Sequence, residues 1–90
     1  MPLQILSSPP PDPELVAERL RERIEAALPG ARVAVAAESP GHFSIEVVSS
    51  SFEGQPRVRQ QQRVYAAIRE LMEGDAPPVH AVDRLVTRAP

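Results

Sequence analysis

The sequence predicts an α+β domain of order αββαβ, in which two helices pack on one face of a three-stranded mixed sheet. Apolar and polar residues alternate over residues 43–47, the period of a strand, and apolar residues recur every three or four positions over 16–28 and 64–72, the period of a helix. Because a helix separates the second and third strands, those two are expected to be parallel. The first two strands form an antiparallel hairpin.

Length and composition limit the protein to one small domain. A chain of 90 residues has one core and buries roughly 60–65% of its unfolded surface. It has no cysteine, which excludes disulfides and thiolate chemistry of its own and fits a reducing compartment. No apolar run reaches the ~18 residues that span a bilayer, and the N-terminus lacks the features of a signal peptide. We therefore expect a cytoplasmic protein without a membrane partner.

The first helix is expected to follow a flexible lead-in. Residues 1–11 are rich in proline and precede a single domain over residues 12–90. Residues 12–14, Asp-Pro-Glu, supply a capping carboxylate, a proline for the first helical position and an acid for the first turn. The predicted apolar stripe is Val16, Leu20, Ile24, Ala27 and Leu28. The charges spaced for pairing on the outer face are Glu18, Arg21 and Glu25. Residues 29–30, Pro-Gly, end the helix.

The middle of the chain predicts a hairpin. Residues 31–37 form a short strand, residues 38–41, Glu-Ser-Pro-Gly, supply turn chemistry, and residues 43–48 form the second strand. Residues 49–56 are too many for a tight turn and are rich in loop formers, and Phe52 is expected to anchor this loop in the core.

A second helix follows the loop and ends near Glu73, before the breakers of residues 74–78. Its predicted apolar stripe is Val64, Tyr65, Ile68, Leu71 and Met72. Residues 79–86 then predict the third strand, with His80 near its start. Strict alternation would group His80 with Val82 and Val86, and the opposite face would carry Ala81 and Leu85. The sequence alone does not decide which of these faces is buried.

Two histidines are the candidate metal ligands. His42 begins the second predicted strand and His80 lies near the start of the third, so pairing of these strands can bring them together. Two imidazoles fill half of a typical four-ligand site, so a metal would need ligands from a partner. Capping, packing and surface roles are the alternatives for each histidine. No nucleophile, base and orienting group are brought together by the sequence, which argues against an enzyme.

Arginines form a second candidate site. All basic residues are arginines, and Arg57, Arg59 and Arg63 lie in an acid-free stretch that extends to Arg69, although the net charge is -2. Such a cluster favours an anion or an acidic partner, and a solvated helix face is the alternative interpretation.

Several short sequence motifs of the chain resemble those of the BolA family. They are HF at 42–43, VVS at 47–49, FEG at 52–54, VY at 64–65 and VHAV at 79–82. Together with the αββαβ order the resemblance covers residues 12–87, and Gln61 and Gln62 resemble the IbaG or YrbA branch. Many family members carry Arg-His-Arg in the second helix, whereas this chain has Gln62 and Arg63, so no role of a helix histidine transfers.

The resemblance implies a fold similar to the class II KH domain and a role as partner of monothiol glutaredoxins in iron-sulfur cluster trafficking or iron sensing. It implies a bridged [2Fe-2S] cluster, with thiolates from glutaredoxin and glutathione and imidazoles from His80 and a second residue, for which His42 is the candidate. The isolated chain would then be a monomer without a cofactor. The family also permits the alternative of a DNA-binding transcriptional regulator of stress responses, in which Arg57, Arg59 and Arg63 would contact the nucleic acid.

Overall fold

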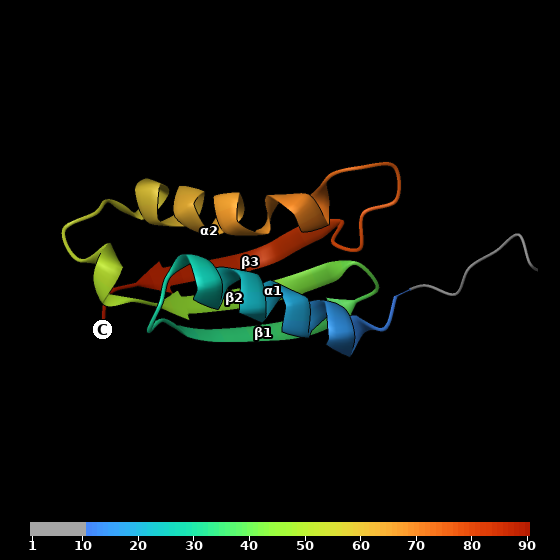
Figure 1. The fold of residues 1–90 in the computed structure, drawn as a ribbon, viewed down its shortest axis with the longest axis horizontal. Coiled ribbons are helices and arrows are strands. Elements are labelled where there is room, and N and C mark those ends of the chain that lie inside the picture. The colour runs from blue at the N-terminus through green and yellow to red at the C-terminus, as the bar shows by residue number, and fades with distance from the viewer. Residues whose placement is uncertain (1–10) are drawn as a thin grey trace, which may run out of the picture.

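A computed structural model describes residues 11–90 of the chain, so the predicted lead-in lies outside the described residues except for Pro11. The elements, in chain order, are α1 (Pro13–Ala27), β1 (Arg32–Ser39), β2 (His42–Val48), the 3-10 turn η2 (Ser50–Phe52), α2 (Arg57–Met72) and β3 (Ala81–Arg88). Figure 1 shows β1, β2 and β3 side by side in one sheet, with the helices along them. No helix of residues 11–90 is both long and apolar enough to cross a membrane.

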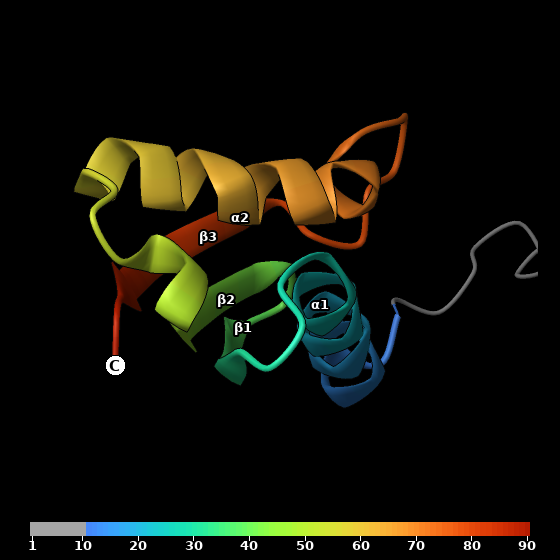
Figure 2. The ribbon, with the colours of Figure 1, turned by 60° about the vertical axis from the view of Figure 1, so that its left-hand side comes forward.

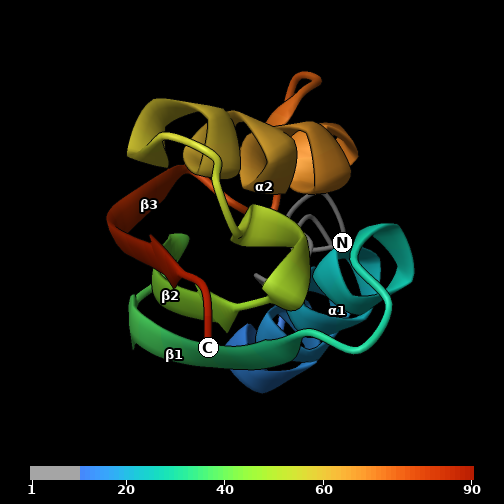
Figure 3. The same ribbon diagram turned by 90° about the vertical axis from the view of Figure 1, so that its left-hand side faces the viewer.

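The sheet has the predicted topology. Its strand order is β1-β2-β3, with β1 and β2 antiparallel and β2 and β3 parallel. Both helices lie on the same side of the sheet, α1 next to β1 and α2 next to β3, as Figures 2 and 3 show from two directions. The predicted α+β class with two helices on one face is therefore confirmed.

The start of α1 follows from its cap. The Asp12 carboxylate accepts a hydrogen bond from the Glu14 N–H, and Pro13 occupies the first turn. The buried residues are Val16, Leu20, Ile24 and Leu28. The prediction that Ala27 belongs to the buried stripe is wrong, since Ala27 is exposed. Steps of four residues rotate the buried face gradually around the helix, and at the C-terminus Ala27 lies about 100° away from Leu28.

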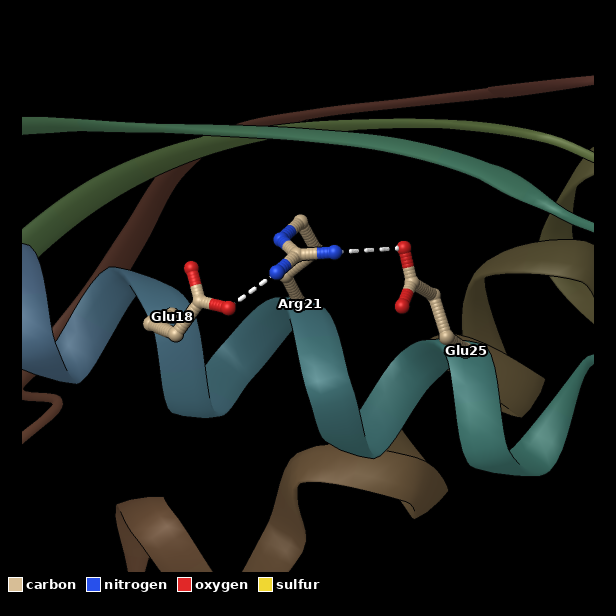
Figure 4. A network of polar contacts seen from close by, with 3 residues as sticks. All are labelled: Glu18, Arg21 and Glu25. Atoms are coloured by element: carbon tan, nitrogen blue, oxygen red, sulfur yellow. Dashed lines mark hydrogen bonds and ion pairs between the residues drawn. The ribbon is translucent and has the colours of Figure 1, made fainter.

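The outer face of α1 carries the predicted charge pairs. The Arg21 guanidinium donates to the carboxylates of both Glu18 and Glu25, as Figure 4 shows. The hydrogen bond to Glu18, followed by that to Glu25, raises the pKa of Arg21 above its usual value. These groups are exposed to solvent, so the ion pairs lie on the helix surface and contribute little to the stability of the domain.

The second helix buries a similar but shifted stripe. Its buried residues are Gln60, Val64, Ile68 and Leu71. The prediction that Tyr65 faces the core is wrong, because Tyr65 is 39% exposed and lies about 100° from Val64 around the helix. The helical spacing of apolar residues did not predict the burial of Gln60, whose side-chain amide donates to the carbonyl of Gln55 at 2.9 Å. It thereby holds the chain before α2 against the helix.

The loop before α2 is anchored as predicted. Phe52, the last residue of η2, is 1% exposed and belongs to the core. The Ser49 hydroxyl caps the turn by accepting from the Ser51 N–H at 3.1 Å. This loop therefore packs as an ordered turn between β2 and α2.

The third strand differs from its predicted position and alternation. It begins at Ala81, and the preceding Val79 is buried and donates its N–H to the Leu71 carbonyl at 3.0 Å. A register shift leaves Asp83 without a partner on β2. Val82 and Leu85 consequently both pack against the core, so strict alternation along this strand is wrong.

Candidate functional site

The two histidines meet at one end of the sheet. His42 is the first residue of β2 and pairs with Ala81, the first residue of β3, so His80 lies directly beside this pair. The imidazole ring centroids are 6.4 Å apart and the rings stand edge to face at 82°. His80 is exposed and the His42 side chain is 41% exposed, so both rings are accessible from outside the protein.

Gly41 makes room for the His80 ring. Its carbonyl accepts hydrogen bonds from the N–H groups of His80 at 2.8 Å and Ala81 at 3.1 Å. The glycine has a φ of +80, and a Cβ added there would lie 2.5 Å from His80 Nδ1, closer than real Cβ contacts allow. Sequence reasoning identified Gly41 only as a turn residue, although a glycine directly before one candidate ligand was a usable signal.

Asp83 orients His42. The Asp83 carboxylate lies 3.0 Å from His42 Nδ1. An ionised carboxylate only accepts hydrogen bonds, so this contact places a proton on Nδ1, and in the neutral form of the ring the lone pair is then on Nε2. Asp83 was not recognised from the sequence. The usable signal was its position two residues after Ala81, since strand alternation places both on one face and Ala81 pairs with His42.

An apolar hollow lies beside His80. A cavity of about 180 Å³ opens beside His80. The residues that line it include Pro13, Val16, Pro40, Phe43 and Pro78. Within residues 11–90 no group of three His, Cys, Asp or Glu side chains is arranged to hold a metal. His42 and His80 thus offer two imidazole donors, of which His80 lies beside an apolar recess, and a metal held there would require further ligands from another molecule.

The predicted arginine cluster is divided by the fold. Arg57 and Arg59 are exposed in the first turn of α2. The guanidinium of Arg63 instead donates to the Ser51 carbonyl at 3.2 Å and lies 5.9 Å from the centroid of the Phe52 ring. Arg63 therefore links α2 to η2 through a hydrogen bond and a contact with the Phe52 ring. The length of α2, about 24 Å for its residues, separates Arg57 and Arg59 from the histidine pair at the other end of the molecule.

The architecture and the site together define a small αββαβ domain with a histidine pair at one end of a mixed sheet. The family model described as "BolA-like protein" matches residues 18–90. The chain therefore belongs to the BolA family, as its short sequence motifs predict.

One protein sequence and two solved structures are similar to this chain. An "Uncharacterized protein in rpoN-murA intergenic region" of Acinetobacter guillouiae is 40% identical over 65 residues, which are 72% of this chain and 75% of that protein. The structure of BolA1 from Arabidopsis thaliana matches with a TM-score of 0.67 and 28% identity over 82% of this chain and 90% of that chain. A bolA protein homologue from Coxiella burnetii matches with a TM-score of 0.66 and 30% identity over 81% of this chain and 88% of that chain.

Proposed function

We propose that the protein is a non-enzymatic, cytoplasmic partner of a monothiol glutaredoxin and helps to bind a bridged [2Fe-2S] cluster in iron-sulfur trafficking or iron sensing. The observation that carries this proposal is the pair of accessible imidazole rings of His42 and His80, 6.4 Å apart at one end of the sheet. Membership of the BolA family supports the choice of partner.

The donor set fits a shared cluster. Biological [2Fe-2S] clusters take four ligands, and imidazoles replace thiolates on one iron in some of them. This chain has no cysteine, so it offers His42 and His80 and leaves the thiolates to glutaredoxin and glutathione. Imidazole ligation raises the reduction potential of such a cluster when it is bound, a property useful for sensing.

The residues around the pair support ligation by defined atoms. A metal-bound histidine usually donates its other ring N–H to a carboxylate or carbonyl, which fixes the tautomer and the ring orientation. The contact of Asp83 with His42 Nδ1 supplies this arrangement and leaves Nε2 for a metal. The apolar recess beside His80 would keep water from that side of the site.

A spectroscopic titration tests the proposal. Cluster-bearing, glutathione-loaded monothiol glutaredoxin is mixed with wild-type protein, His80→Ala, His42→Ala or, as a matched control, Asp75→Ala, which alters an exposed residue of the segment before His80. Visible absorption and circular dichroism should change on adding wild type and Asp75→Ala, and His80→Ala should lose this change. Identical spectra for wild type and His80→Ala would remove His80 as a ligand.

Nucleic-acid binding is a second candidate function. Arg57 and Arg59 are exposed at the start of α2 and form no ion pair within residues 11–90. Binding to duplex DNA through these residues should weaken steeply with salt, because phosphate contacts release counterions. Measured by fluorescence anisotropy, it should be lost in Arg57→Ala/Arg59→Ala and retained in Arg69→Ala. Equal affinities of the two variants would refute this role.

A further inference from the structure

The strand β1 forms an open border of the sheet. Within residues 11–90 it pairs only with β2, and Figure 1 shows it as the lowermost strand of the sheet. An edge strand presents a row of unpaired N–H and C=O groups to any strand that can pair with it. Arg32–Ser39 contains neither lysine nor proline, the residues that commonly protect such edges, and its single irregularity lies at its end, between Ala37 and Ser39.

Two opposite charges lie near the ends of this strand on the open face of the sheet. Arg32 pairs with Val48, and Ala34 and Ala36 pair with Glu46 and Ser44 on the same face. Glu38 borders the shallow hollow on that face that Ala34 and Ala36 also line. Both charged side chains belong to exposed residues. Within residues 11–90 neither one forms an ion pair.

This spacing makes the strand complementary to itself. We propose that β1 pairs antiparallel with β1 of a second copy of the chain, about a two-fold axis at Val35. Residues equally distant from the axis then oppose each other, so Arg32 faces Glu38 of the second copy, and the reverse pair forms at the other end. A shift of the axis by one residue places neither charge opposite the other. The charges therefore select one register.

The helix α1 packs next to β1, so a second copy paired with β1 would bring its own α1 close. A groove of about 370 Å³ runs between α1 and β1 and is lined by apolar groups of Ala17 and Val35 and by the charged side chains of Glu18 and Arg21. In the proposed pair, the α1 helices of the two copies lie on the same face of a continuous six-stranded sheet. The charges of both signs on the groove rim allow the two helices to approach without net repulsion.

The interface is small, so dimerisation should depend on concentration. One pair of short strands buries less surface than stable dimers do, and the monomer expected from the sequence should persist in dilute solution. Sedimentation equilibrium of the full chain should show dimers at high concentration. Arg32→Glu and Glu38→Arg should each raise the dissociation constant about tenfold, because each change converts two cross-strand attractions into repulsions.

Combining the charge reversals makes the test specific. The double variant Arg32→Glu/Glu38→Arg restores opposite charges across the interface and should return the dissociation constant to within about twofold of wild type. The control Arg59→Glu, on the far helix, should leave it unchanged, and circular dichroism checks that all variants are folded. A chain that stays monomeric to millimolar concentration, or single reversals without effect, would overturn the proposal.

The absence of cysteine allows the register to be tested directly. Ala34 and Ala36 oppose each other across the proposed axis, at about 5 Å between Cα atoms, within the range of a disulfide. An oxidised mixture of Ala34→Cys and Ala36→Cys proteins should form the mixed disulfide dimer. Either protein alone should cross-link poorly, since like positions are then about 8 Å apart. Equal cross-linking of the mixture and of either variant alone would contradict this register and this mode of pairing.

Discussion

Replacement of Gly41 by alanine should both destabilise the domain and displace His80. The loss of unfolding free energy has two contributions, one from the backbone and one from the His80 ring, that can be measured separately. An alanine at a φ of +80 occupies the left-handed region, which costs about 1–2 kcal/mol. The new methyl group would also lie 2.5 Å from His80 Nδ1 and 2.7 Å from Cγ, so the imidazole must leave its rotamer, which costs about 0.5–1.5 kcal/mol more. The sum predicts a loss of about 1.5–3.5 kcal/mol of unfolding free energy.

Two other glycines isolate the second cost. Gly30 and Gly54 have φ values of +86 and +77, and a Cβ at either would have no neighbour within 4 Å. Alanine at these positions should therefore cost only the backbone term. In a His80→Ala background the ring is absent, so Gly41→Ala should then cost no more than the control substitutions.

Urea denaturation followed by circular dichroism measures these differences in unfolding free energy. In thermal unfolding, Gly41→Ala should lower the melting temperature further than the controls, by about 4–8 °C for each additional kcal/mol in a domain of this size. The NMR signals of the His80 ring should shift only in the Gly41 variant. Equal losses for all three alanine variants, with an unchanged His80 spectrum, would refute the packing argument.

Two further predictions concern side chains near the ends of the sheet. Phe52→Ala should destabilise the domain by about 3–5 kcal/mol, since the ring is 1% exposed. Tyr65→Ala should have a much smaller effect. A similar loss of unfolding free energy for both variants in urea denaturation would contradict the assigned burial. Asp83→Ala removes the hydrogen-bond acceptor at His42 Nδ1. Nitrogen-15 NMR of the neutral ring should therefore show a shift from the Nδ1-protonated toward the Nε2-protonated tautomer. An unchanged tautomer ratio would show that Asp83 does not orient the ring.

Local rules were sufficient to predict most of the fold. The helix cap at Asp12, the alternation around Ile45 and the helical spacing of Val64 and Ile68 each act over a few residues, and all three interpretations are confirmed. The order of the elements then restricts the topology strongly, because a helix between two neighbouring strands makes them parallel.

The errors arise where packing over longer distances decides. Ala27 and Tyr65 satisfy a helical period, but the buried faces drift around both helices because their buried residues are mostly four apart. Gln60 is buried because carbonyl groups of the preceding loop meet its side chain, a contact that no periodicity contains. The packing of both Val82 and Leu85 against the core depends on a register shift between β2 and β3, which a single strand sequence does not reveal.

The meeting of the two histidines depends on equal lengths of a strand and a helix. From His42 the chain advances along the seven residues of β2, about 23 Å. It then returns along the 16 residues of α2, about 24 Å. The chain thus re-enters the sheet at the end where β2 begins, and Gly41 accepts the N–H groups of His80 and Ala81 there. An antiparallel β3 would have placed His80 a whole strand length from His42. Parallel pairing is therefore the feature of the fold that creates the candidate metal site, and the backbone of Gly41 and the side chain of Asp83 only refine its geometry.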